Sequence, residues 1–316
     1  MATTALKPRK TQKRQKPPSR EAWLEGLNYA QRQRLRFFDA KLLWEGRVTR
    51  EDVRGQFGVT KNHFTRDVSD YREFYPQNFE LDAWKGGYRP KGTFKPVFAT
   101  GQPEEYLALL RLYCAMPIAP VMAELGTSVP TAMPLEPAGK INQRVLSTVL
   151  RAIHGQSGVT ISYQSFTQEE PSTRTIWPHA LIWSGERWYA RAFDSRRKTY
   201  LDMALQRIIK AEPLSDPLPG EAGQDVEWQN SELVEVIPNP QLSKPQQKAI
   251  ADEYGMDETK KGYVWRVELR RCLIPYFLQR HRLDDTRPSK TRNGVPTQRI
   301  LVKNPEIVKK YAFPAD

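Results

Sequence analysis

The stretch from Val159 to Ile209 constrains the fold most, because short apolar runs typical of β-strands follow one another closely along it. Val159, Ile161 and Tyr163 alternate with polar residues, which is the period of a half-buried strand. The sequence Ser184-Gly185-Glu186 separates two later runs and predicts a hairpin turn. Strands this short and this closely spaced predict a small, strongly bent sheet or barrel.

Five separated motifs occur along this stretch. They are Ile161-Ser162-Tyr163, Arg174, Trp177-Pro178-His179-Ala180-Leu181, the run from Arg187 to Asp194, and Leu205-Gln206-Arg207-Ile208. Together they resemble the WYL domain, whose Trp-Tyr-Leu tripeptide stands here as Trp188-Tyr189-Ala190. The neighbouring Arg191-Ala192-Phe193-Asp194, with Tyr163-Gln164-Ser165, is most similar to WYL repressors of the BrxR/CapW type, which are found beside bacterial phage-defence systems.

Three arginines on different predicted strands form a candidate ligand site with nearby polar residues. The expected ligand-binding residues are Tyr163, Ser165, Arg174, His179, Arg191 and Arg207. Arginine pairs with phosphate at two points, and tyrosine stacks on bases. Three positive charges in one small domain would repel each other without an anion, so we expect a nucleotide or single-stranded nucleic-acid ligand. The resemblance adds weight for Arg191 and His179, since the matching positions of WYL domains form the ligand pocket.

The same residues also admit a structural interpretation. Arg207 could pair with Asp202 or Glu212, and Tyr163 lies on the apolar face of its strand. Both interpretations stay open from the sequence.

Residues 21–95 predict a winged helix-turn-helix. Helical patterns run from Arg20 to Trp44, from Arg50 to Phe57 after an N-cap at Thr49, and from Lys61 to about Phe74. A turn at Gly58-Val59 precedes the third helix. Helix, glycine-containing turn and helix at this length are typical of DNA-binding domains. The alternative is a three-helix structural domain whose polar face is merely solvated.

The third of these helices is the expected recognition helix. Phe64, Val68 and Tyr71 form its core face, while its other side carries hydrogen-bonding side chains suited to bases and phosphates. The run from Phe79 to Ala83 and the turn at Gly86-Gly87 predict a hairpin wing with a basic tip, and Lys91 lies at its exit. The expected DNA-binding residues are Thr60, Lys61, Asn62, His63, Thr65, Arg66, Ser69, Arg72, Lys85 and Arg89.

Proline-rich segments divide the middle of the chain. Residues 96–138 are expected to be a helical linker region, with a helix from Gln102 to about Cys114 and an irregular, extended stretch from Met116 to Pro137. Residues 139–214 are assigned to the ligand-sensing WYL domain, which begins with an amphipathic helix from Gly139 to His154.

A linker at 215–220 separates off a last domain, residues 221–316. Its runs follow a β-α-β-α-β order, which predicts a small α+β layer domain. The resemblance implies that it is the C-terminal extension through which such WYL proteins form dimers.

Positive charge is concentrated at the start of the chain. The net charge is +13, and residues 1–20 carry seven lysines and arginines but no acidic residue. Such a tail cannot bury apolar surface, so a disordered basic arm is expected. It would contact DNA phosphates or serve as a solubilising extension.

Several classes of protein find no support in the sequence. No apolar run approaches the ~18 residues of a membrane span, and no signal peptide is recognisable. Cys114 and Cys272 stand far apart, and the four histidines are scattered, so neither a metal site nor another cofactor is expected. A nucleophile elbow and a phosphate-binding glycine loop are both missing, which argues against an enzyme. A cytoplasmic protein is the expectation.

The sequence therefore predicts an α+β multidomain protein with a winged helix-turn-helix, a small SH3/Sm-like β-barrel (the WYL domain) and a small α+β C-terminal domain. The expected function is a DNA-binding transcriptional regulator, a homodimeric repressor that binds an inverted repeat and senses a nucleotide or nucleic acid through its WYL domain. Control of a phage-defence operon is what the resemblance implies. The alternative is a non-regulatory nucleic-acid-binding accessory protein whose WYL barrel holds single strands for a partner enzyme.

Overall fold

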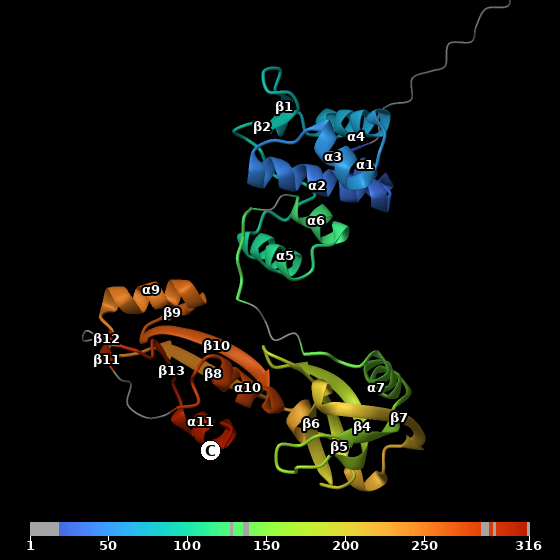
Figure 1. The fold of residues 1–316 in the computed structure, drawn as a ribbon. Coiled ribbons are helices and arrows are strands. Elements are labelled where there is room, and N and C mark those ends of the chain that lie inside the picture. Colours follow the sequence, from blue (N-terminus) through green and yellow to red (C-terminus); the bar gives the residue numbers. More distant parts are fainter. Residues whose placement is uncertain (1–18, 127–128, 135–138, 286–290, 293–294, 315–316) are drawn as a thin grey trace, which may run out of the picture. The chain divides into compact units, whose positions relative to one another are not determined.

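The computed structural model describes residues 19–126, 129–134, 139–285, 291–292 and 295–314. The chain divides into two units, residues 1–135 and 136–316 (Figure 1). Of the basic arm expected over residues 1–20, all but Ser19 and Arg20 lies outside the described residues.

Six helices and one hairpin make up the described part of the first unit (Figure 1). They are α1 (Arg20–Gly26), α2 (Tyr29–Glu45), α3 (Arg50–Phe57), α4 (Lys61–Phe74), β1 (Phe79–Leu81), β2 (Tyr88–Pro90), α5 (Pro103–Ala115) and α6 (Ala119–Leu125). The helix-turn-helix and the wing therefore have the predicted order.

Local sequence signals explain the helix boundaries of the helix-turn-helix. Thr49 is the N-cap of α3, as predicted, and it forms a reciprocal capping box with Asp52. Gly58 ends α3 with φ at 64°, a left-handed conformation that glycine adopts without a steric penalty. On α4, Phe64, Val68 and Tyr71 are buried, which confirms the predicted core face.

A buried carboxylate links separate segments in the core of this unit. Asp39 on α2 is fully buried and accepts hydrogen bonds from the N–H groups of Val97 and Phe98 at 2.6 and 2.8 Å. The Tyr71 hydroxyl donates to its other oxygen at 2.7 Å. Burial raises the pKa of Asp39 to about 6, although these hydrogen bonds oppose the rise. The network fixes the segment after the wing against α2 and α4.

Helix α6 corrects the expectation of an extended stretch from Met116 to Pro137. Pro120 lies in the first turn of α6, where no intrahelical N–H donor is needed, so it does not break the helix. Arg36 on α2 pairs with Glu105 of α5 at 2.7 Å and with Glu124 of α6 at 2.5 Å. These ion pairs hold both later helices against α2.

The second unit begins with α7 (Gln143–Gly155) and a five-stranded antiparallel sheet. The strands are β3 (Ser157–Tyr163), β4 (Ser172–Trp183), β5 (Trp188–Asp194), β6 (Thr199–Ala204) and β7 (Ile208–Pro217), in the spatial order β6-β5-β4-β3-β7. Apolar residues of α7 and of the sheet face form one core, including Val149, Ile161 and Ile176.

This sheet is open among the described residues, because β6 and β7 are its two edges and do not pair with each other. The SH3/Sm-like barrel expected here is therefore not confirmed. Strand β7 also continues to Pro217, into the segment expected to be a linker.

A second antiparallel sheet lies in the C-terminal part, in the order β13-β8-β10-β9. The elements are α8 (Val226–Gln229), β8 (Ser231–Pro238), α9 (Lys244–Tyr254), β9 (Asp257–Thr259), β10 (Gly262–Arg270), α10 (Ile274–Arg280), β11 (Thr291–Arg292), β12 (Val295–Pro296), β13 (Ile300–Val302) and α11 (Pro305–Tyr311). The predicted β-α-β-α-β order is present, and α8, α11 and three short strands are added to it.

Candidate functional site

The polar face of α4 is open for contacts. All eight residues predicted on it, from Thr60 to Arg72, are exposed. The Arg66 side chain is 82% exposed and approaches Asp70 at 4.0 Å, a contact of little energetic weight at the surface. Thr65 donates its hydroxyl to the Lys61 carbonyl at 2.9 Å. A helix with this face can enter a major groove.

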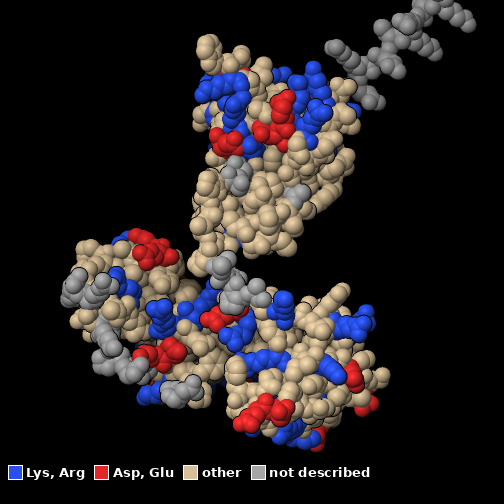
Figure 2. Space-filling view, viewed as in Figure 1, with Lys and Arg blue, Asp and Glu red and all other residues tan. Residues whose placement is uncertain are grey.

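The two predicted wing residues differ in their surroundings. Lys85 is exposed at the tip of the hairpin. Arg89 pairs with Glu80 on the neighbouring strand at 2.7 Å, so part of its charge is neutralised. Lys91, at the exit of the wing, donates to the Pro76 carbonyl at 2.9 Å. Figure 2 shows lysine and arginine gathered at the end of the first unit that carries α4 and the hairpin, whereas the end formed by α5 and α6 is mostly uncharged.

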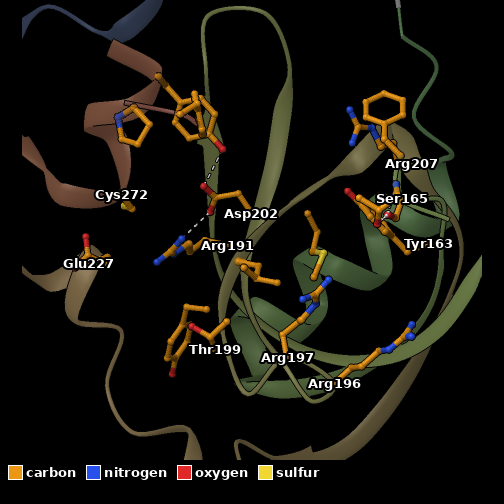
Figure 3. Close-up of a pocket in the computed structure, with 18 of the residues that line it drawn as sticks. Tyr163, Ser165, Arg191, Arg196, Arg197, Thr199, Asp202, Arg207, Glu227 and Cys272 are labelled. Atoms are coloured by element: carbon orange, nitrogen blue, oxygen red, sulfur yellow. Dashed lines mark hydrogen bonds and ion pairs between the residues drawn. The ribbon is translucent and has the colours of Figure 1, made fainter. Parts of the chain in front are cut away.

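A hollow of about 1210 Å³ lies between the five-stranded sheet and the C-terminal part of the second unit. Figure 3 shows Tyr163, Ser165 and Arg207 on one side, Cys272 and Glu227 on the opposite side, and Arg196 and Arg197 along a third. Seven basic side chains line it against two acidic ones, Asp202 and Glu227. The basic residues are Arg174, Arg191, Arg196, Arg197, Arg207, Arg271 and Lys310.

Two of the three predicted arginines already have carboxylate partners, so the expected mutual repulsion of three unpaired charges is wrong. Arg174 pairs with the fully buried Asp194 at 2.9 Å, and its guanidinium lies over the Tyr163 ring. The other Asp194 oxygen accepts the backbone N–H groups of Arg196 and Arg197. Arg174 therefore positions the loop that carries two exposed cations.

Arg191 joins the sheet to the C-terminal part. Its Nε and Nη2 lie 2.7 and 2.9 Å from the two carboxylate oxygens of Asp225, and its Nη1 lies 3.1 Å from Asp202. The Tyr276 hydroxyl of α10 donates to the other Asp202 oxygen at 2.8 Å. We call Arg191, Asp202, Asp225 and Tyr276 the interdomain joint. Arg191 therefore holds this joint together and also lines the hollow.

Asp225 is held ionised in this joint. Burial alone would raise its pKa, but hydrogen bonds from Arg191 and His179 outweigh burial and leave the pKa well below its usual range. His179 Nε2 lies 2.9 Å from the carboxylate, and its ring makes edge contacts with the rings of Tyr200 and Trp228. Among the described residues, His179 is not part of the lining of the hollow. His179 therefore lies at the interdomain joint, where it contacts Asp225, and not at the hollow.

Arg207 stacks on an exposed aromatic ring. Its guanidinium lies 3.7 Å from the centre of the Phe166 ring, which is 85% exposed. No ion pair joins Arg207 to Asp202 or Glu212 among the described residues. Ser165 bonds to Thr167 at 2.7 Å in the same loop. This flat, cationic platform at the rim of the hollow suits a base and its phosphate.

Sequence reasoning missed Phe166, Arg196, Arg197 and the acidic and tyrosine members of the joint. The run Arg196-Arg197-Lys198 after a predicted strand was a usable signal for cations in a loop. Asp225 gave no such signal, because it is distant in sequence from the strands that it binds. Cys272 also lines the hollow, and burial raises the pKa of its thiol to about 11, so it is not a reactive thiolate.

Comparisons with known proteins bear on all three parts of the chain. The winged helix-turn-helix domain of the BrxR transcriptional regulator matches residues 30–112. The WYL domain matches residues 144–213, and the C-terminal dimerization domain of BrxR matches residues 232–308. The DNA-binding transcriptional repressor CapW of Escherichia coli (strain KTE188) is 31% identical over 262 residues, which are 83% of this chain and 86% of that protein.

This chain belongs to the BrxR/CapW family of WYL-domain transcriptional regulators.

Two further proteins are similar to this chain. CapW of Pseudomonas aeruginosa is 29% identical over 285 residues, 90% of this chain and 93% of that protein. The solved structure of proteasome accessory factor B/C (PafBC) of Arthrobacter aurescens covers 89% of this chain and 46% of its own, at 18% identity and a TM-score of 0.27, which is too low to support an argument. Within the described part of this BrxR/CapW family member, no helix has the length and apolar character needed to cross a membrane.

Proposed function

We propose that this chain is a homodimeric repressor that binds an inverted repeat in duplex DNA and responds to a nucleotide or short single-stranded nucleic acid bound in the hollow of its second unit. The exposed polar face of α4, with Asn62 and Arg66, supports the DNA-binding half of the proposal. The matched dimerization domain supports the dimer, because two recognition helices then meet two half-sites. The family supports control of a phage-defence operon.

The chemistry of the hollow supports a nucleic-acid ligand. Arg196 and Arg197 are exposed, and their side chains make no ion pair among the described residues. The stack of Arg207 on Phe166 adds an aromatic face on another side of the same hollow. Guanidinium groups bind phosphate at two points, and aromatic faces stack on bases with little sequence preference. The combination favours a ligand with both phosphates and bases.

The observation that carries the regulatory part is the double role of Arg191. A ligand shifts a protein between two states only when it binds one of them more tightly. A phosphate that approaches Arg191 competes with Asp225 for the same guanidinium, and loss of that pair loosens the interdomain joint. Ligand binding and the geometry of the dimerization domain are then coupled by one side chain.

Footprinting on the DNA upstream of the protein's own gene tests the proposal. We expect protection of two symmetric half-sites whose centres are separated by about one or more helical turns of ~10 bp, with two chains per duplex in sedimentation. A monomer bound to an asymmetric site would rule out the dimeric repressor. Binding to single strands with no duplex protection would instead favour the accessory protein.

A further inference from the structure

The tip of the β1–β2 hairpin presents a bare indole ring. Trp84 is 93% exposed. Among the described residues its ring has no aromatic or cationic neighbour, and its backbone N–H donates only to Asp82. A tryptophan in this position contributes nothing to the core of the domain, so its indole is available to a partner outside the chain.

The turn that carries Trp84 is held in a defined shape. One Asp82 carboxylate oxygen accepts the N–H groups of Trp84 and Lys85, each at 3.0 Å. The Arg47 guanidinium donates to the carbonyl oxygens of Lys85 and Gly86. Gly87 has φ at 84°, and a Cβ there would lie 2.5 Å from the Val48 carbonyl oxygen. The indole is therefore presented by a fixed turn.

The surroundings of the indole suit the DNA backbone. Lys85 is exposed beside it, and Arg47 brings a second positive charge to the base of the same turn. A groove of about 540 Å³ runs between α4 and the hairpin. Its charged lining residues are Arg72, Lys91, Glu73 and Glu80, and Ser69 of α4 and Leu81 of β1 also line it. The recognition face and the hairpin thus adjoin one groove. A duplex read by α4 in its major groove brings the hairpin tip close to the adjacent minor groove.

We propose that Trp84 is a wedge that enters the minor groove beside each half-site and partly unstacks one base step. Apolar side chains inserted in this way kink the duplex and favour the flexible TA and CA/TG steps. Arg89, the other basic side chain on the hairpin strands, pairs with Glu80, so it is less available to read the groove. Trp84 would add sequence preference at positions that α4 does not touch.

This inference rests on the proposed DNA-binding function, and one experiment separates their failures. The full-length protein is titrated onto its footprinted duplex with 2-aminopurine placed in turn at each step that flanks a half-site. Trp84→Ala is compared with Trp84→Phe and with Lys85→Ala. Because Trp84 is exposed and has no ring contact, all three variants are expected to fold, which circular dichroism checks.

We expect the wild type to raise 2-aminopurine fluorescence at one flanking step, and Trp84→Ala to abolish this signal and weaken binding about tenfold. Trp84→Phe should keep most of the signal, and Lys85→Ala should weaken binding and the salt dependence while keeping the signal. An unchanged signal in Trp84→Ala would overturn the wedge alone. A loss of self-association in Trp84→Ala with an unchanged signal would assign the indole to a protein contact and also overturn it. If the wild type bound no duplex, both proposals would fail.

Discussion

Arg191 and Asp225 form a two-point ion pair between the WYL sheet and the start of the C-terminal part, and their side chains are only 8% and 6% exposed. The same guanidinium reaches Asp202 and lines the hollow. One side chain therefore bonds to two carboxylates and faces the candidate ligand site. This position makes Arg191 a structural residue of the joint and, in the function that we propose, the residue through which a ligand reaches the joint.

Removal of Arg191 should destabilise the second unit. Arg191→Ala leaves Asp225 and Asp202 without their cation, and breaking a buried pair in this way costs ~3–5 kcal/mol. Arg187→Ala is a matched control, because Arg187 pairs with the largely exposed Glu186 and should change stability by ~0–1 kcal/mol. Urea denaturation of the full-length variants measures both values. Equal, small effects would show that the interdomain joint does not hold the unit together.

We expect the platform of Phe166 and Arg207 to contribute to ligand affinity but not to operator affinity. Phe166→Ala should weaken binding of a fluorescent oligothymidylate by ~1–3 kcal/mol, the usual value of one base stack. Operator affinity without ligand should stay at the wild-type level. Trp188→Ala removes a partly exposed aromatic ring from β5, outside the lining of the hollow, and should change neither value. Oligonucleotide affinity that is unchanged in Phe166→Ala would remove the platform from the ligand site.

The Arg66→Ala variant should show whether Arg66 contacts a base or only phosphate. Its side chain is 82% exposed on α4, so Arg66→Ala should leave the fold intact. A bidentate contact with a guanine would make the loss on operator DNA ~1–3 kcal/mol, with a much smaller loss on random duplex. Gel shifts on the two duplexes measure the difference. The same loss on both would mean that Arg66 contacts phosphate only.

Asp39 should make the winged-helix unit less stable as pH rises from 4 to 6. Its folded-state pKa, about 6, lies above the usual value of 3.8, so the folded chain holds this proton more tightly than the unfolded chain. Stability therefore falls between the two values, by up to ~3 kcal/mol, and is flat above them. Protection of the Val97 and Phe98 amides from hydrogen exchange, corrected for intrinsic rates, reports the change. Protection that rises with pH over this range would contradict the raised pKa.

Much of the fold follows from local signals in the sequence. The capping box of Thr49 and Asp52, the turn at Gly58 and the apolar spacing on α4 involve residues close in the chain, so the helix-turn-helix was predictable. The extended stretch expected after Met116 was wrong because Pro120 occupies a first turn, where proline is tolerated. A proline in the sequence is compatible both with the first turn of a helix and with an extended stretch, so it could not distinguish these two structures.

The candidate site was less predictable for a physical reason. The charge state of an arginine cluster depends on which carboxylates fold against it, and Asp225 reaches Arg191 from 34 residues away. His179 was expected at the ligand but contacts Asp225 instead, because both lie where the C-terminal part packs on the sheet. The alternating pattern of a strand predicts on which face of the sheet each side chain lies, but it does not identify partners from another domain.

The most direct test of the whole account is operator affinity measured by fluorescence anisotropy with and without saturating single-stranded oligonucleotide or mononucleotide. For the wild type we predict that one of these ligands changes the operator Kd at least about tenfold, which requires ~1.4 kcal/mol of differential binding. The Phe166→Ala, Arg207→Ala double variant should keep the wild-type Kd and lose the response. A ligand that binds the hollow tightly and leaves the wild-type operator Kd unchanged would contradict the coupling at the centre of the account.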